Sequence, residues 1–333
     1  MPKTPTIHDI ARAANVSPST VSRVLTGNTP VAAPKRAAVL AAIEALNFRP
    51  NVVARGLARG RSMAIGVLTQ SMVSLFYGEL AQGIEQGLYG SGYFPVFATG
   101  QWRLAQEIES LNLLIERQVD ALIVLDGQLE DERLCSIARQ IPLVAVGRSI
   151  AGLEGHCIRV ENYQGAYRAT RYLIELGHKR IAHITGLPTH LDALERRDGY
   201  QQALRDAGLE VDERLIVEGE FSEQSGLVAV EALLARASRF TAVFAANDQM
   251  AYGARLAFYR RGLRIPADIS LIGFDDLTSS AYVTPPLTTV RHHMVAIGKA
   301  AAEGALKLLS GEAVNFPKVA TELVIRESTA LLR

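Results

Sequence analysis

The spacing of hydrophobic positions changes near residue 62 of this 333-residue chain. Before that point, apolar side chains recur three and four residues apart, which is the helical pattern. After it, short apolar runs alternate with longer amphipathic stretches, and this alternation predicts parallel sheets with helices on both faces. The runs that predict buried strands are 64–68, 120–125, 143–146, 181–184, 241–245 and 269–273. The stretches that predict helices are 80–88, 104–117, 167–176 and 250–261, and Gly177, Gly208 and Gly262 suit helix C-termini.

The first sixty residues predict three short helices. Thr6 and Asp9 have the spacing of a capping box for the first helix. Asn15 tolerates the left-handed backbone of a tight turn, and Ser17 and Pro18 are typical of the start of a second helix. The residues expected to face inward are Ile7, Ile10, Ala11 and Ala14, then Val21, Val24 and Leu25, and then Ala38, Leu40, Ala41 and Leu46 on a third helix at 34–46.

Charge is divided unevenly along the chain. Residues 1–62 contain nine Lys and Arg against two Asp and Glu, a net charge of +7. Because the whole chain carries only +1, the remainder carries −6. A basic helical module joined to a mildly acidic body indicates a contact with a polyanion. Two helices joined by a tight turn in such a module predict a helix-turn-helix, which places its second helix in the DNA major groove.

The start of the second helix carries the side chains expected to contact DNA. Pro18, Ser19 and Ser22 suit shape, methyl contact and hydroxyl hydrogen bonds. Arg23 suits either a guanine edge or a phosphate. The predicted DNA-binding residues of the helical module are Thr6, Ser17, Pro18, Ser19, Thr20, Ser22, Arg23 and Asn28.

Composition and motifs narrow the class of protein. The 48% hydrophobic and 21% charged residues are typical of a soluble globular chain. We expect a cytoplasmic location, since no apolar run reaches the roughly 18 residues of a membrane span and the N-terminus lacks a signal core. Cys135 and Cys157 lie far apart and are expected to be free thiols. No metal-ligand spacing, nucleophile elbow, phosphate loop or dinucleotide motif occurs, so neither an enzyme, a cofactor nor a metal is expected.

The string TIHDIARAANVSPSTVSRVL at 6–25, with NFRPN at 47–51 and ARGL at 54–57, closely resembles the LacI/GalR family of bacterial regulators. The resemblance implies a DNA-binding domain at 1–50 and a hinge helix with its linker at 51–62. It also implies operator contacts by Asn51 and Arg55, and insertion of Leu57 into the minor groove. Two residues depart from the family pattern: Ala32 replaces a helix-capping serine, and Gly56 loosens the hinge helix by about 1 kcal/mol relative to alanine.

The resemblance extends through an effector-binding core at 63–333, which is similar to the two-lobed α/β periplasmic-binding-protein fold with parallel sheets. It implies three crossings between lobes, near residues 162, 292 and 320. The first lobe is then expected at about 63–162 and 293–320, and the second at about 163–292 and 321–333. Effectors of such folds bind beyond the carboxyl ends of the strands.

Polar residues near strand ends fall at positions that line the family's effector pocket. Arg196, Asn247 and Asp275 supply donors, an amide and an acceptor that suit adjacent sugar hydroxyls, and Phe221 suits stacking on the ring. The full predicted effector set is Phe76, Tyr77, Arg148, Arg196, Phe221, Asn247, Asp275 and His292. The expected non-ligand roles are helix capping for Asp248 and Asp276 and surface or lobe packing for Trp102. Gly147 stands where the family often has aspartate, so Arg148 is free to meet an anion, which raises sugar phosphates and uronates as candidates.

The sequence therefore predicts a homodimeric repressor of carbohydrate-utilisation genes, bound to a pseudo-palindromic operator in the nucleoid and controlled by a sugar or sugar derivative. The chain ends without a leucine-heptad tail, which favours a dimer over a tetramer. An alternative is a purine-responsive regulator of the same architecture, because Arg196, Phe221 and Asp275 also suit a stacked base. A response to a phosphorylated partner protein has no specific support in the sequence.

Overall fold

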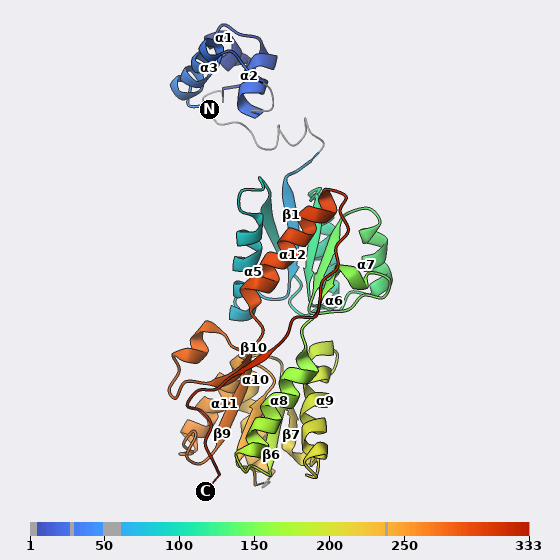
Figure 1. The fold of residues 1–333 in the computed structure, drawn as a ribbon, viewed down its shortest axis with the longest axis vertical. Helices are drawn as coiled ribbons and strands as arrows, with labels where there is room; N and C mark the ends of the chain where they lie inside the picture. Colours follow the sequence, from blue (N-terminus) through green and yellow to red (C-terminus); the bar gives the residue numbers. More distant parts are fainter. Residues whose placement is uncertain (1–4, 27–29, 49–60, 237–238, 333) are drawn as a thin grey trace. The chain divides into compact units, whose positions relative to one another are not determined.

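The computed structural model describes residues 5–26, 30–48, 61–236 and 239–332 (Figure 1). Internal contacts divide the chain into two compact units, Met1–Ser62 and Met63–Arg333. The first unit is helical, and the second holds two separate sheets with helices on both faces of each. The predicted combination of a small all-α module and a two-lobed α/β core is therefore confirmed.

The first unit contains the three predicted helices, α1 (Ile7–Ala13), α2 (Pro18–Thr26) and α3 (Ala33–Ala45). The predicted capping box is present, since Thr6 N donates to Asp9 Oδ2 at 2.9 Å and Asp9 N donates to Thr6 Oγ1 at 3.4 Å. Asn15 has a φ of 50°, the left-handed conformation that the turn between α1 and α2 needs. Ile10 and Val21 are completely buried, as the pattern predicted.

The inner face of α3 differs from the prediction. Val39 and Ala42 are its buried residues, whereas Leu40 is 51% exposed and Leu46 is 38% exposed. The predicted register was wrong because nearly every position of this alanine-rich helix is apolar, so hydrophobicity does not single out one face. Ala32, which replaces the family's helix-capping serine, is the N-cap residue of α3, and α3 has no side-chain cap hydrogen bond there.

The first lobe of the second unit has a parallel sheet of strand order β2-β1-β3-β4-β5. Its strands are β1 (Ala64–Thr69), β2 (Phe94–Thr99), β3 (Ala121–Leu125), β4 (Leu143–Val146) and β5 (Cys157–Ile158). One face is covered by α5 (Leu75–Leu88) and α12 (Met294–Leu309), and the other by α6 (Leu104–Glu116) and α7 (Asp131–Ala138). The helix α12 thus belongs to a lobe whose strands lie far earlier in the sequence.

The second lobe has a sheet of order β11-β10-β9-β8-β6-β7, in which only the pairing of β11 is antiparallel. Its strands are β6 (Ile181–Thr185), β7 (Ile216–Glu218), β8 (Ala242–Ala245), β9 (Ser270–Asp275), β10 (Thr288–Arg291) and β11 (Glu322–Val324). The helices on its two faces are α8 (Asn162–Glu175) with α9 (Leu191–Asp206), and α10 (Glu223–Ala235) with α11 (Asp248–Arg260). The remaining short turns of 3-10 helix are Glu154–His156, Glu213–Leu215 and Thr278–Ala281.

All six predicted strands are present, and they are the central strands β1, β3, β4, β6, β8 and β9. The sequence pattern missed the four edge strands, β2, β5, β7 and β11, together with the polar strand β10. Edge strands are short or partly exposed, so they lack the continuous apolar run that marks a strand buried on both faces.

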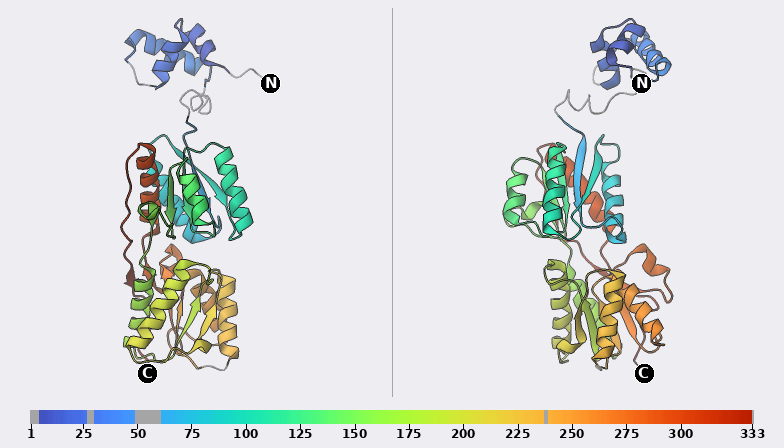
Figure 2. Two further views of the ribbon diagram at one scale, coloured as in Figure 1. Left: turned by 90° about the vertical axis from the view of Figure 1, so that its right-hand side faces the viewer. Right: turned by 180° about the vertical axis from the view of Figure 1, so that it is seen from behind.

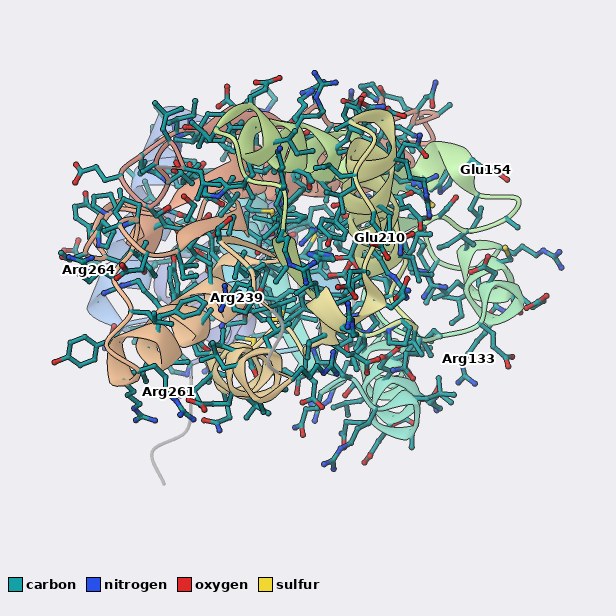
Figure 3. The ribbon with its side chains drawn as sticks, turned by 90° about the horizontal axis from the view of Figure 1, so that it is seen from below. Arg133, Glu154, Glu210, Arg239, Arg261 and Arg264 are labelled. Atoms are coloured by element: carbon teal, nitrogen blue, oxygen red, sulfur yellow. The ribbon has the colours of Figure 1, made fainter. Side chains whose placement is uncertain are left out.

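The chain passes between the two lobes in three places: from β5 to α8, from β10 to α12, and from α12 to β11. The first and third passages meet where Val160 and Val319 form a parallel bridge. Figure 2 shows the segment after α12 running down the side of the first lobe to reach the second. Viewed from below, the labelled charged side chains Arg133, Glu154, Arg261 and Arg264 project outward from the lobes (Figure 3).

Glycines let α5 and α12 approach closely. A Cβ atom at Gly83 would lie 2.1 Å from the carbonyl oxygen of Val295, and one at Gly298 would lie 2.1 Å from that of Leu80. Both distances are far inside van der Waals contact, so only glycine permits this backbone approach. The close crossing fixes α12 to the first lobe.

We expect Gly83→Ala to lower the free energy of unfolding by about 1–3 kcal/mol, because the added methyl group forces α5 and α12 apart. The matched control is Gly78→Ala on the same helix, where no described atom lies within 4 Å of an added Cβ. There the smaller backbone entropy of alanine in the unfolded chain stabilises by about 0.4–1 kcal/mol. Urea unfolding of both variants measures the difference. Equal stabilities would show that the fold does not depend on this close crossing.

Candidate functional site

The N-terminal turn of α2 presents a small hydroxyl cluster at the surface. Ser17 Oγ accepts a hydrogen bond from Thr20 N at 3.2 Å and lies 2.8 Å from Ser19 Oγ. Ser17 therefore caps the helix as predicted. Pro18 and Ser19 are exposed while Val21 on the opposite side is completely buried, so the buried face of α2 holds the exposed one outward.

The other predicted DNA-binding residues of the first unit are exposed or half-buried. Ser22 and Arg23 are exposed on α2, and Thr6 is exposed at the start of α1. Four predicted residues lie outside the described part of the chain: Asn28, Asn51, Arg55 and Leu57. The structure thus gathers Pro18, Ser19, Ser22 and Arg23 onto one helix surface.

In the second unit, a cavity of about 260 Å³ lies between the two lobes. Its walls include the carboxyl ends of several strands: Asp126 follows β3, Asn247 follows β8, and Asp275 is the last residue of β9. This is where parallel sheets present ligand-binding side chains. The predicted residues that line the cavity are Phe76, Tyr77, Arg196, Phe221, Asn247 and Asp275.

Arg196 is the buried charge at the centre of this site. It lies within α9, which begins at Leu191, and the residue is only 3% exposed. Its Nε donates to Asn162 Oδ1 at 3.0 Å, and its Nη1 donates to the carbonyl oxygen of Ala246 at 2.5 Å. The guanidinium also stacks over the ring of Phe274, 3.8 Å from its centroid. These contacts fix the plane of the guanidinium.

Two carboxylates flank the guanidinium. Asp275 Oδ1 and Asp192 Oδ2 each lie 3.6 Å from an Arg196 nitrogen. Burial raises the pKa of Asp275 to about 8, although the positive charge of Arg196 opposes that rise. Asp275 also has a φ of 112°, in the region that ordinarily favours glycine, so its backbone is strained. This strained residue lines the cavity.

His292 does not line the cavity and instead supports Asp275 from behind. Its Nε2 lies 3.1 Å from Asp275 Oδ1, and the residue is 1% exposed. Burial and the nearby Arg196 lower the pKa of His292 to about 3, so the ring is neutral and its Nε2 shares a hydrogen bond with the Asp275 carboxyl group. The structure gives His292 a positioning contact to Asp275, and its predicted ligand contact stays a prediction.

Asn247 has a structural role as well as a place in the cavity wall. Its Oδ1 accepts from Met250 N at 2.9 Å and so caps α11, while its Nδ2 donates to the carbonyl oxygen of Phe221 at 3.1 Å. Phe221 has a φ of 57°. The amide therefore holds the Phe221 turn at the mouth of the site, and the two residues form one unit.

The predicted cap roles of Asp248 and Asp276 were wrong. Asp248 is completely buried and accepts from Ser280 Oγ and Thr289 Oγ1, each at 2.6 Å. Asp276 instead pairs with the guanidinium groups of Arg291 and Arg326. Because both carboxylates are satisfied inside the second lobe, neither belongs to the cavity.

Arg148 also lies outside the wall of the main cavity. Its Nη2 donates to Leu129 O at 2.7 Å and to Asp131 Oδ1 at 2.8 Å. The expectation that Arg148 waits for an anion is therefore weakened, because Asp131 already neutralises it. Gly147 beside it has no space for a side chain, since a Cβ there would lie 1.7 Å from Asp126 Oδ1.

Asp126 supplies a carboxyl group at this edge of the first lobe, where Gly147 has no side chain. The hydroxyl group of Tyr77 donates to Asp126 Oδ2 at 2.9 Å. Burial and the neighbouring charge of Asp192 raise the pKa of Asp126 to about 7. Sequence reasoning missed Asp126, although it directly follows a buried strand just as Asn247 does.

Trp102 and Asp192 are two further cavity residues that the sequence did not reveal. The predicted packing role of Trp102 was incomplete, because its ring both lines the cavity and stacks on His190 of the second lobe, 4.1 Å between centroids. Asp192 precedes Arg196 by one helical turn, a spacing that signals an ion pair. Trp102 offered no comparable signal, since its partner comes from the other lobe.

Further contacts join the lobes around the cavity. Ser74 Oγ donates to Gln249 Oε1 at 2.7 Å, and Thr278 Oγ1 donates to Glu79 Oε1 at 2.9 Å. With the stacking of Trp102, these contacts hold the two lobes against each other across the site.

The described residues contain neither a membrane-spanning helix nor a cluster of metal-binding side chains. No helix among them is both long and apolar enough to cross a membrane. Nor do they contain a group of three or more His, Cys, Asp or Glu side chains arranged to hold a metal ion.

Comparison with known proteins identifies similar sequences and structures. Residues 6–51 match the family model of bacterial regulatory proteins, lacI family, and residues 170–329 match that of the periplasmic binding protein-like domain. The HTH-type transcriptional regulator GalR of Escherichia coli (strain K12) is 38% identical over 91% of this chain and 89% of its own length. The HTH-type transcriptional repressor PurR of Vibrio atlanticus (strain LGP32) is 35% identical over 90% of each chain. The lac repressor dimer bound to operator and the anti-inducer ONPF has a TM-score of 0.88 at 30% identity, covering 98% of this chain and 100% of that one.

The raised pKa of Asp126 predicts a pH-dependent stability. The folded carboxyl group keeps its proton up to about pH 7, whereas an unfolded aspartate releases it near about pH 4. The stabilising contribution is therefore full below about pH 4 and is lost as the pH rises through about 7. Asp126→Asn removes this titration while preserving an acceptor for Tyr77. We expect the variant's stability relative to the native chain to rise by about 1.4 kcal/mol for each unit between pH 5 and pH 7.

Urea unfolding across that range measures the effect. The control is Asp268→Asn, because Arg264 lowers the pKa of Asp268 to about 2 and its carboxylate is ionised across the whole window. The free energy of unfolding of this control should change with pH in the same way as that of the native chain. Parallel behaviour of Asp126→Asn would mean that Asp126 is also ionised in the folded protein at pH 5.

Proposed function

This chain belongs to the lacI family of bacterial regulatory proteins, and on that premise we propose that it represses carbohydrate-utilisation genes under the control of a sugar. The observation that carries the proposal is the polar set around the main cavity. Arg196 supplies fixed donors, Asp275 supplies an acceptor, and Phe221 supplies an aromatic face. Adjacent hydroxyl groups on an apolar ring match this combination, because each hydroxyl both donates and accepts.

DNA recognition is assigned to the first unit. The exposed face of α2, with Pro18, Ser19, Ser22 and Arg23, is the surface proposed to enter the major groove. The similar lac repressor structure is a dimer bound to its operator. We therefore assign this chain as a homodimer on a pseudo-palindromic operator, acting in the cytoplasm and associated with the nucleoid when bound to DNA. The wedge role of Leu57 and the contacts of Asn51 and Arg55 belong to the same proposal.

The control mechanism is a shift between two lobe arrangements. Ligand in the cavity changes the contacts that join the lobes, such as Ser74 with Gln249 and Thr278 with Glu79. Different lobe angles place the two DNA-binding units of a dimer at different spacings. Ligand and operator then prefer different lobe arrangements, so each shifts the equilibrium between them. A coupling of about 1–3 kcal/mol changes operator affinity roughly 5–150-fold.

An enzymatic role is not proposed. Asp275 and Asp276 are adjacent carboxylates, but they serve different partners: Asp275 faces the cavity and Asp276 pairs with two arginine side chains. Paired acid–base work needs two carboxyl groups facing one substrate. This pair does not meet that requirement.

A purine effector is the second candidate. Similarity to PurR supports it, as does the parallel stack of Phe221 and His190, whose planes differ by 1°. Aromatic walls of this kind suit a base as well as a sugar. The three carboxyl groups in the cavity wall, from Asp126, Asp192 and Asp275, favour the sugar because they match several hydroxyl groups.

Arg23→Ala should relax the base preference of operator binding and cost about 1–3 kcal/mol on the preferred sequence. The physical reason is that an arginine fork on the exposed face of α2 reads a guanine edge with two hydrogen bonds. Binding to the operator and to single-base variants measures the change. The control is Arg12→Ala, because Arg12 lies on α1 and its loss should weaken all sequences alike. A uniform loss for Arg23→Ala would assign it to a phosphate.

Arg196→Lys should abolish or strongly reduce the effector response, because lysine keeps the charge but loses the planar fork. Thermal unfolding against sugars, sugar phosphates and purines first identifies the ligand, since a ligand at 100 times its Kd adds about 2.7 kcal/mol. Operator binding with and without that ligand then compares the variants. The control is the neighbouring Arg197→Lys, whose side chain is 38% exposed and pairs with Glu213. An unchanged response in Arg196→Lys contradicts the assignment, and a purine hit replaces the sugar.

A further inference from the structure

A second cavity, of about 160 Å³, adjoins the main one. The two cavities share Trp102, Asp126 and Asp192 in their walls. The smaller one extends away from Asn247 and Asp275 toward Arg148 and Ser149 of the first lobe and His190 of the second. Its volume corresponds to roughly five water molecules of about 30 Å³ each. This compartment is therefore large enough for a polar group comparable to one sugar ring.

The smaller cavity contains buried polar atoms without protein partners. His190 is 7% exposed, and among the described residues neither of its ring nitrogens has a hydrogen-bond partner. Arg148 Nε, in the same wall, is likewise buried and unpartnered within the described chain. Buried polar groups are almost always hydrogen-bonded, to protein, water or ligand, so these atoms make the smaller cavity a compartment that a hydrogen-bonding group can occupy.

The charges around this cavity select among ligand types. Asp126 and Asp192 lie in its wall, so a phosphate or carboxylate group would either meet like charge or require these carboxyl groups to be protonated. Arg148 is already paired with Asp131, and an ammonium group would face its guanidinium. A hydroxyl group both donates and accepts, so it can satisfy the carboxyl oxygens and the donors of Arg148 and His190 together. The matching ligand group is uncharged and carries several hydroxyl groups.

Aromatic side chains separate and line the two compartments. Trp102 belongs to both walls and stacks on His190 at 4.1 Å, while His190 lies parallel to Phe221 at 5.6 Å. Phe221 in turn belongs to the main cavity. Because the two cavities share wall residues, a ligand with two rings joined by one linkage can place one ring in each compartment.

We propose that the effector is a neutral disaccharide, with one ring in the main cavity beside Arg196 and the second in the smaller cavity beside His190. This inference rests on the proposed function, since it assigns a second subsite to the same sugar. Two occupied compartments also join both lobes to one ligand, because Ser149 and Arg148 come from the first lobe and His190 from the second.

Calorimetric titration of the full chain tests the proposal. The probes are maltose, cellobiose, lactose, melibiose, trehalose and sucrose, each against its own monosaccharides, with glucose 6-phosphate and galacturonate as charged comparisons. We expect at least one disaccharide to bind tenfold or more tightly than either of its monosaccharides, and neither charged sugar to match it. Adenine and hypoxanthine are titrated in parallel.

Two variants locate the second ring. His190→Phe keeps a ring against Trp102 but removes both nitrogens, and Ser149→Tyr fills the smaller cavity. Each should reduce the ratio of disaccharide to monosaccharide affinity, His190→Phe by roughly tenfold and Ser149→Tyr to near one. The control is His8→Phe, an exposed histidine of the first unit, which should leave the ratio unaltered.

The outcomes separate the two proposals. A monosaccharide or charged sugar that binds as tightly as every disaccharide overturns the second subsite but leaves the sugar-responsive function in place. Purine binding without sugar binding overturns both. A disaccharide preference that survives His190→Phe and Ser149→Tyr unchanged overturns the placement of the second ring, and loss of the preference in both variants supports it.

Discussion

The buried guanidinium of Arg196 organises the ligand-binding unit. A charge that is only 3% exposed is costly to bury unless every side of it is satisfied. Here Asn162 and a backbone carbonyl bind its edge, Phe274 covers its face, and Asp275 lies 3.6 Å away. These partners come from α8, from the end of β8 and from β9. Satisfying this one charge therefore brings together the elements that form the second-lobe wall of the cavity.

The carboxylates of this region fall into two groups with different roles. Asp248 accepts hydrogen bonds from Ser280 and Thr289, and Asp276 forms ion pairs with Arg291 and Arg326, all within the second lobe. Asp126, Asp192 and Asp275 instead line the cavity. Burial raises the pKa of Asp126 to about 7 and that of Asp275 to about 8, so both sit near the point of protonation at neutral pH. A ligand whose hydroxyl groups donate hydrogen bonds to these carboxylates favours their ionised forms. Ligand binding is then linked to proton release.

The position of the cavity explains how its contents reach the rest of the molecule. Each lobe supplies a separate sheet, and the lobes are joined by three chain passages and by contacts such as Trp102 with His190. Packed lobes resist deformation but rotate about such passages. The close crossing of α5 and α12 packs α12 tightly against the first lobe.

The sequence by itself determined the elements whose signals are local. The capping box of Thr6, the turn at Asn15 and the central strands follow from short-range pattern, and so do polar residues such as Asn247 and Asp275 that directly follow or end a strand. Tertiary structure decided what depends on distant partners. The inner face of α3, the edge strands and the stacking of Trp102 on His190 have no local signature, because each is set by the element packed against it. The same holds for Asp126, whose carboxyl group lies in the space that a side chain at Gly147 would fill. These two residues are distant in the sequence, so their contact has no local signature.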